Sequence, residues 1–522
     1  MAEIRFGGGL NQLDDELVNI EECIDGENFL LNADKREFIP RPGFALKGTA
    51  TNALPVRGIM QLVKRDNTET TLIQAGPDVY VWDGAASFTS KTPTSSTPIK
   101  TDSVLRGTYW SLDDLLIITD VSLQSPVWEW NGTTISELSH GIAGVTDLFA
   151  KWSVVWNNRI WLFNIKTDAT LNPHMLLAGE FEVRTNFDNS VTPETTSVAL
   201  VSTAPFYMLA PDLKPINAVA VFYDTLLIST KDGAVFKITG HTAADYKIVP
   251  YYSGSSVAGN ELMINIGNDV MYVKTGGKIE TLRSTEQFGD TKADDASKWI
   301  PDEVANINSG VMTYDQKNQR VMLFTNNKLL VLDKYIWDQQ QNVSPWMKWT
   351  TGMASNLDVE AAAYIKIPGT QNRSVYFGGP LGQIYDANGS SGDAGSVLVN
   401  AFRKTRLIQE LDTVNEIVSG RITYRRKAAQ NLQMTFEWTD EYADSINNVP
   451  LKAPVTSIGS IFWGGNNYWG EAIYWGAGGV SEERVSTVGF SAVGKGPSFF
   501  LTTRVVGTSD FTITRINTTE GT

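Results

Sequence analysis

The chain has 522 residues, of which 42% are hydrophobic and 10% aromatic, and its 43 basic and 58 acidic side chains give a net charge of −15. A chain of this length exceeds one compact core, so we expect two or three domains. The acidic balance argues against a protein whose main task is to hold phosphate backbones, and its simplest interpretation is solubility. The single cysteine, Cys23, excludes an intrachain disulfide framework.

The opening residues contain no apolar stretch of the kind that a signal peptide requires, and nowhere do about 18 apolar residues follow one another. We therefore expect folding in a cytosol and no membrane-spanning segment. Frequent glycine, 15 tryptophans and the near absence of helical periodicity favour many short strands joined by turns. The sequence predicts an all-β protein.

Residues 1–55 differ in composition from the rest of the chain. The segment is glycine-rich at 6–11, acidic between Asp14 and Glu22, and rich in charge and proline at 33–43. Because it has too little apolar content to fold alone, we expect an N-terminal arm that docks on another part of the protein.

A repeated hairpin runs through the middle of the chain. In its three clearest copies, 225–238, 269–282 and 320–332, apolar residues flank a two-residue corner. The corners are Asp232-Gly233, Gly276-Gly277 and Asn326-Asn327. These residue pairs tolerate the positive φ angles of tight hairpin turns, so the pattern predicts antiparallel strand pairs.

Looser copies at 71–84, 114–132, 159–164 and 374–386 bring the total to about seven units. The strand expected before each hairpin recurs about every 45–50 residues. Its seven markers are Ile59, Gly107, Trp152, Ala218, Met263, Val311 and Ala361. Small sheets that cannot bury both faces alone are covered by radial packing, so the period predicts a β-propeller of about seven blades over 56–386. A solenoid would repeat at shorter intervals, and a sandwich would not repeat its turn.

The interval between Trp152 and Ala218 is longer than the others. It contains a stretch rich in Thr, Asn and Pro, which we interpret as an inserted loop around 166–215.

After the repeat, the Gly, Ser, Asn and Asp of 387–395 indicate a linker. Period-two alternation within 396–522 then predicts a small antiparallel β-sandwich. Its segment 462–476 carries the Trp-Gly pairs of Trp463, Trp469 and Trp475, too many large aromatics for an ordinary solvated loop. The loop packs on its own domain, or it contacts a neighbouring subunit or another partner.

No residue pattern marks a catalytic, metal or cofactor site. His140, His174 and His241 lie far apart and lack patterned partners for a triad or a metal. Segment 489–496 has the Gly-x4-Gly-Lys spacing of a phosphate-binding loop, but Gly496 stands where a magnesium-ligating Ser or Thr is needed. We therefore expect a turn between strands there, and no enzyme. A carboxylate pair for glycoside cleavage stays open, because separation in space decides that chemistry.

Two basic patches, 403–406 and 421–427, leave their role open. Three interpretations are open: contact with DNA, the solvated face of the sandwich, or contact with an acidic neighbour. The acidic net charge of the chain favours the last two.

The order of these parts resembles the tail nozzle proteins of short-tailed bacteriophages, also called tail tubular or tail stabilisation proteins. The resemblance rests on Gly-Gly-Leu-Asn at 8–11 with acidic residues after it, Gly-Glu-Asn-Phe at 26–29 and Arg-Pro-Gly-Phe at 41–44. The propeller-like repeat and a C-terminal sandwich with Trp-Gly loops and Val-Gly-Lys-Gly-Pro-Ser at 493–498 complete it.

This resemblance implies a structural virion component, made in the host cytoplasm and located in the tail. Its copies would form a homohexameric ring below the portal and adaptor, as the distal tail tube that retains DNA and conducts it during ejection. The implied partners are other copies of the chain, the adaptor, tail fibre or needle proteins, and double-stranded DNA that passes non-specifically. No cofactor is implied.

Two alternatives to a nozzle remain. Propellers also host lectins and glycosidases, so a glycan-binding or glycan-cleaving protein is one, and another phage tail or baseplate protein is the other. Duplex DNA is too wide for the hub of a single propeller, so in a ring the channel would be the hole between subunits. An acidic lining there would repel phosphate and favour rapid passage.

Overall fold

This computed structural model describes residues 2–4, 8–13, 22–31, 37–93, 97–188, 205–243, 245–252, 256–259, 261–267, 269–282, 294–339, 343–351, 357–367, 370, 372–390, 393–394, 399–405, 408–409, 415–426, 433–440, 447–452, 484–491, 495–496, 498–507 and 511–520, with side chains between residues 8 and 404. The chain divides into two compact units. One comprises Leu46–Leu330 and Ala354–Ala387, and the other comprises Met1–Ala45, Val331–Met353 and Asn388–Thr522.

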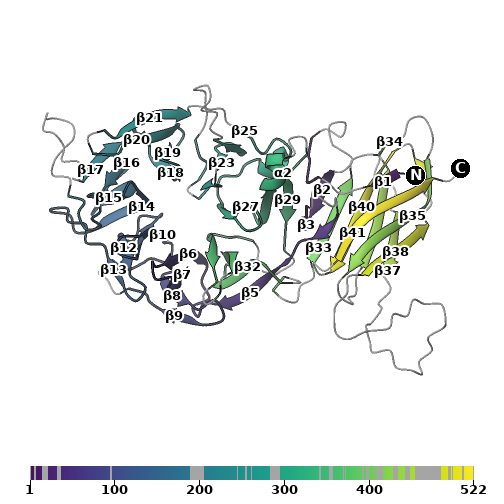
Figure 1. Cartoon of the computed structure of the whole chain (residues 1–522), viewed down its shortest axis with the longest axis horizontal. Helices are drawn as coiled ribbons and strands as arrows, with labels where there is room; N and C mark the ends of the chain where they lie inside the picture. The colour runs from purple at the N-terminus through teal and green to yellow at the C-terminus, as the bar shows by residue number, and fades with distance from the viewer. Residues whose placement is uncertain are drawn as a thin grey trace. The chain divides into compact units, whose positions relative to one another are not determined.

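Seven four-stranded antiparallel sheets follow one another around a ring, and we number these blades in chain order (Figure 1). Blades 1 to 3 are β6 (Val56–Val63), β7 (Glu69–Ala75), β8 (Asp78–Trp82), β9 (Phe88–Ser90); β10 (Leu105–Trp110), β11 (Leu115–Asp120), β12 (Trp128–Trp130), β13 (Ile135–Glu137); and β14 (Leu148–Trp156), β15 (Arg159–Thr167), β16 (Thr170–Ala178), β17 (Phe206–Leu209).

Blades 4 to 7 are β18 (Ile216–Phe222), β19 (Thr225–Thr230), β20 (Val235–Thr239), β21 (Lys247–Tyr252); β22 (Met263–Asn265), β23 (Val270–Lys274), β24 (Lys278–Thr281), β25 (Asp294–Asp295); β26 (Val311–Asp315), β27 (Arg320–Thr325), β28 (Lys328–Asp333), β29 (Trp346–Trp349); and β30 (Ala362–Lys366), β31 (Arg373–Gly378), β32 (Gln383–Ser390), β5 (Gly43–Thr49).

The first strands of the blades form a closed ring. Each contacts the first strand of the next blade, and β30 contacts β6. Blade 7 takes its fourth strand, β5, from near the start of the chain, whereas its other three strands come from the far end of the repeat. Six of the seven sequence markers lie on first strands, and the seventh, Ala361, directly precedes β30. The prediction of an all-β fold with a propeller of about seven blades is confirmed.

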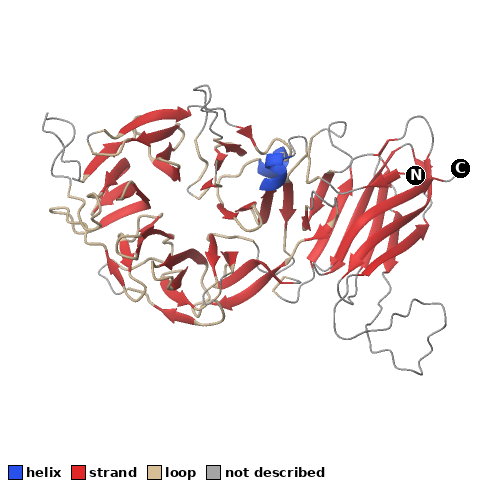
Figure 2. Cartoon of the chain, viewed as in Figure 1, coloured by secondary structure: helices blue, strands red, loops and turns tan. Residues whose placement is uncertain are grey.

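Helix is scarce in the described part of the chain, where the two helices are α1 (Pro301–Val304) and α2 (Lys334–Gln339) (Figure 2). Among the same residues, neither helix has the length and apolar character needed to cross a bilayer.

The hydrophobic core is divided among the spaces between successive blades. One cluster joins Trp161 and Phe163 of blade 3 to Leu226 and Ile228 of blade 4. Second strands such as β11, buried along their whole length, lie between neighbours on both faces and therefore have continuous apolar runs. The hairpin corners take the positive φ angles expected from their sequence, at Asp232 (54°), Gly276 (100°), Gly277 (88°), Asn326 (46°) and Asn327 (61°).

The structure differs from the sequence prediction over 166–215, where we expected an extended loop. The end of β15, the whole of β16 and the whole of β17 lie in this range. The strands β14, β15 and β16 have 9 residues each, which lengthens the blade. Residues 189–204 lie outside the described residues.

The other unit contains two antiparallel sheets. One has the order β1 (Ala2–Ile4), β41 (Phe511–Glu520), β35 (Asn415–Arg426), β38 (Arg484–Ser491), with β39 (Lys495–Gly496) paired to β35. The second has the order β2 (Cys23–Glu27), β33 (Val399–Thr405), β40 (Ser498–Gly507), β36 (Gln433–Asp440), β37 (Asn447–Lys452), with β34 (Ile408–Gln409) paired to β40. A short hairpin joins β3 (Phe29–Leu30) to β4 (Ile39–Pro40). The N-terminal segment thus supplies an edge strand to each sheet.

The segment 387–395, expected as a linker, is partly strand, because β32 continues to Ser390. The segment 489–496 runs from β38 to β39, and β40 follows it. Residues 492–494, where the turn was expected, lie outside the described residues.

Candidate functional site

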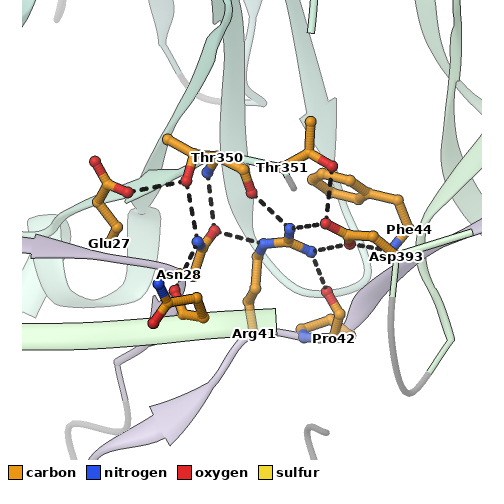
Figure 3. A network of polar contacts seen from close by, with 9 residues as sticks. Glu27, Asn28, Arg41, Pro42, Phe44, Thr350, Thr351 and Asp393 are labelled. Carbon is orange, nitrogen blue, oxygen red and sulfur yellow. Dashed lines mark hydrogen bonds and ion pairs between the residues drawn. The ribbon is translucent and has the colours of Figure 1, made fainter. Parts of the chain in front are cut away.

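A densely connected polar group is the guanidinium of Arg41, which follows β4 and is fully buried (Figure 3). Its Nε donates to Asn28 Oδ1 at 2.8 Å. Its Nη1 donates to the Pro42 carbonyl at 2.8 Å and to Asp393 Oδ1 at 2.8 Å. Its Nη2 donates to the Thr350 carbonyl at 2.6 Å and to Asp393 Oδ2 at 2.7 Å. All the N–H donors of the guanidinium are therefore engaged, and two of them form a bidentate ion pair with the Asp393 carboxylate.

Asn28 is the second centre of this Arg41 network. Its φ of 61° places it in the left-handed region, which asparagine tolerates better than most residues. Its Nδ2 donates to Thr350 Oγ1 at 3.0 Å and to the Asn400 carbonyl at 2.9 Å, and its Oδ1 accepts from the Thr350 amide at 2.8 Å. Asn28 thus connects the turn after β2 with the end of β29 and with β33.

Asp393 completes the network. Besides Arg41, it accepts from the Phe44 amide at 3.0 Å and from Thr351 Oγ1 at 2.9 Å. The Phe44 ring lies under the Arg41 guanidinium, 3.9 Å from its carbon to the ring centroid. Because every donor of Arg41 is engaged within one unit, the network holds distant segments together and offers no group for chemistry.

A second set of contacts uses the opening motif. The Gly9 amide donates to the Ser344 carbonyl at 2.8 Å, and the Leu10 amide donates to the Trp346 carbonyl at 2.8 Å. Glu22 accepts from the side chain of Asn11 at 2.8 Å and from the Ser344 amide at 2.5 Å. A Cβ on Gly9 would lie 2.1 Å from the Trp346 carbonyl oxygen, so only glycine permits this close approach.

These contacts show what the motifs 8–11, 26–29 and 41–44 do: all three meet the segment 343–351. Sequence reasoning missed that segment and Asp393. The density of aromatics at 346–349, Trp-Met-Lys-Trp, was the available indication, since two tryptophans within four residues require burial.

A separate charged group lies in the propeller, where the first strands begin. We call Arg57, Asp102, Arg106, Glu261 and Glu360 the axial cluster. Arg57 and Arg106 are the second residues of β6 and β10, while Glu261 and Glu360 each lie two residues before β22 and β30. Arg106 Nε pairs with Glu261 Oε1 at 2.9 Å, and Arg57 pairs with Glu360 Oε2 at 3.1 Å and with Asp102 Oδ1 at 3.3 Å.

The axial cluster has two positive and three negative side chains. Burial raises the pKa of Glu360, the nearby charges of Asp358 and Asp102 act in the same direction, and Arg57 and Arg106 oppose them. Each glutamate is held by an arginine. In this ion-pair network the arginines offset only part of the effect of burial on Glu360, because the net shift of its pKa is upward.

The structure does not gather the three histidines into one site. His140 precedes β14, with Nδ1 accepting from the Ile142 amide at 3.1 Å; His174 lies in β16; and His241 follows β20. Within the described ranges, no three His, Cys, Asp or Glu side chains are placed to hold a metal ion. Cys23 is buried, which raises the pKa of its thiol to about 12.

The remaining candidate residues are only partly described. Trp463, Trp469 and Trp475 lie outside the described residues. Of the first basic patch, Arg403 is buried, with its guanidinium carbon 5.8 Å from the centroid of the Phe29 ring, so the interpretation of a solvated face is wrong for this residue. Lys404 is half-buried. Arg403 thus packs against the N-terminal segment.

No family model matches the chain, and no curated protein matches it. Among solved structures, the chain is similar to one described as "YCF48 bound to D1 peptide", at 10% identity and a TM-score of 0.41 over 67% of this chain and 97% of that one. A β-propeller domain of Cps50 (Swd1) from Myceliophteria thermophila has 11% identity and a TM-score of 0.40 over 66% and 98%. The extracellular domain of a hybrid two-component system from B. thetaiotaomicron has 11% identity and a TM-score of 0.42 over 78% and 47%. Similarity at this level carries no argument about function.

Proposed function

We propose that this chain is a structural subunit of the distal tail tube of a short-tailed bacteriophage, where a ring of copies retains DNA and then conducts it during ejection. One observation carries the proposal. The motifs behind the resemblance, at 8–11, 26–29 and 41–44, are used together in buried contacts that bind the N-terminal segment to 343–351 and Asp393. Buried contacts of this kind favour a structural use of the motifs, as expected of a tube subunit.

The axial cluster supports a DNA path outside the propeller hub. Arg106 lies in blade 2 and its partner Glu261 in blade 5, so their ion pair crosses the ring. In the proposed assembly, DNA passes through the hole between subunits. The net charge of −15 suits a surface along which phosphate does not adhere.

The mass of the purified chain in solution tests this proposal. We expect a closed ring, because a head-to-tail contact that closes gives a fixed number of subunits, and the resemblance implies six copies. A chain that stays monomeric at every concentration and with its virion neighbours contradicts the proposal. Glycan cleavage that is lost when one Asp–Glu pair is replaced by Asn–Gln would support the glycosidase alternative instead.

A variant of segment 462–476, which carries the Trp-Gly pairs, tests which segment joins the subunits. Replacing Trp463, Trp469 and Trp475 by Ser should leave the propeller folded and weaken ring formation or binding of a tail partner, since aromatic anchors dominate interface energies. Oligomer mass and thermal unfolding of the variant and the parent are compared. If the ring and its partner binding survive and only the C-terminal unit loses stability, the loop packs inside its own unit.

A further inference from the structure

The Arg106–Glu261 ion pair joins blades that are not neighbours. Contacts between first strands follow the order of the blades around the ring. Blades 2 and 5 are separated by two blades on one side and three on the other, which places them on nearly opposite sides. An ion pair of 2.9 Å between a residue of β10 and a residue just before β22 therefore spans the axis.

The boundary between blade 7 and blade 1, which we call the seam, has its own polar contacts. Gln61 Nε2 donates to the Lys366 carbonyl at 2.6 Å, and Gln61 Oε1 accepts from the Lys366 amide at 2.9 Å. The Lys366 ammonium pairs with Glu69, and Arg57 pairs with Glu360 at 3.1 Å. The chain also joins these two blades, because β5 of blade 7 leads through residues 50–55 into β6 of blade 1, and the polar contacts hold the first strands β30 and β6 against each other.

Arg106 contacts both sides of the seam although it belongs to blade 2. Its Nη1 donates to the Arg57 carbonyl of blade 1 at 2.7 Å, and its Nη2 donates to the Glu360 carbonyl that precedes blade 7, at 3.0 Å. With Nε on Glu261, one guanidinium connects the beginning, the middle and the end of the propeller sequence. A lysine could carry the charge but not the three separate donor directions.

We propose that Arg106 stabilises the centre of the propeller ring, by tying the blade 7 to blade 1 seam to blade 5 across the axis. The alternative is a local role, in which Arg106 stabilises only its own strand and the adjacent β6. The two differ in where the effect of a substitution appears. A role across the axis transmits the effect to β30 and β22, which do not pair with β10.

Hydrogen exchange of the full chain, read by peptide, tests this placement. In Arg106→Met we expect exchange in the peptides over 357–367 and 261–267 to become at least about tenfold faster, because one hydrogen bond to a charged group accounts for about that factor. Peptides over the strands β16 and β20 should not change. Arg106→Lys should show the same pattern with a smaller amplitude, and it serves if the methionine variant does not fold.

Arg184→Met is the matched control. Arg184 also forms two ion pairs, with Glu129 at 3.0 Å and with Asp113 at 3.1 Å, but both partners belong to blade 2. We expect its effect to stay near blades 2 and 3. If Arg106→Met and Arg106→Lys change exchange only in β10, β6 and β11, or uniformly over the propeller, the role across the axis is overturned.

Discussion

Replacing Arg41 by methionine tests whether the Arg41 network holds the N-terminal segment in place. The side chains of Arg41 and Asp393 are 0% and 1% exposed, so the substitution leaves a buried carboxylate without its counter-charge. Breaking a buried pair from one side costs about 3–5 kcal/mol. Asp393 keeps the donors Phe44 and Thr351, whereas the carbonyls of Pro42 and Thr350 lose theirs, so we expect about 4 kcal/mol.

Hydrogen exchange of peptides over 22–31, 343–351 and 399–405 measures this loss, because local opening of the segment exposes those amides. The control is Arg65→Met, which breaks a pair with Asp114 in which the arginine is 63% exposed. Such a pair contributes less than about 1 kcal/mol. A result for Arg41→Met no larger than the result for Arg65→Met would refute the reasoning.

The double variant Arg41→Met, Asp393→Leu separates the ion pair from the packing. Replacing both charges by apolar side chains removes the unpaired carboxylate, which is the expensive part of the single substitution. We therefore expect the double variant to be more stable than Arg41→Met alone. If the losses of the two single variants simply add, the pair does not couple and the network is not organised around it.

Three further outcomes follow from the structure. Burial raises the folded-state pKa of Glu360 above its unfolded value, so the native state binds the proton more tightly, and this contribution to stability is lost as the pH rises through the folded pKa. Urea unfolding from about pH 4 to 7 should therefore show an unfolding free energy that falls with pH, and Glu360→Gln should remove the part of this fall that is due to Glu360. Cys23 should react with a thiol reagent only after unfolding, because its thiol is buried and has a pKa of about 12; fast labelling of the folded protein would contradict this. Gly378→Ala places a Cβ 2.4 Å from Val56 Cβ, across the seam between blades 7 and 1, and should lower the unfolding free energy by about 1–3 kcal/mol. An unchanged melting temperature would contradict this, because it would mean that the backbone shifts there without cost.

The repeat was predictable because its information is local. Each hairpin carries its own apolar alternation and its own corner residues, as in 225–238 and 320–332, and every blade needs the same pattern. The fourth strand of blade 7 was not predictable in this way. β5 belongs to a segment expected as an arm, and its partner β32 lies near the far end of the repeat, so no local pattern links them.

Blade 3 shows why one interval was misinterpreted. The pairing of β15 with β16 is irregular between Phe163 and Ile165, and Asn164 there has a φ of 54°. β16 also contains Pro173, a residue that usually argues against a strand. An irregular ladder interrupts the period-two alternation on which the prediction depended, so strand residues resembled loop residues.

The axial cluster can be predicted from the sequence once the blades are aligned by their first strands. The second position of a first strand holds a charged residue in blades 1 and 2, Arg57 and Arg106. In the other blades it holds Phe149, Asn217, Ile264, Met312 and Ala363. Charged residues at a position that is otherwise uncharged need partners, because an unpaired charge beside the packed strands would be costly. The matching acidic residues lie two positions before β22 and β30, where Glu261 and Glu360 stand. Aligning the blades by their first strands therefore predicts which residues meet at the axis, although no single blade contains the information.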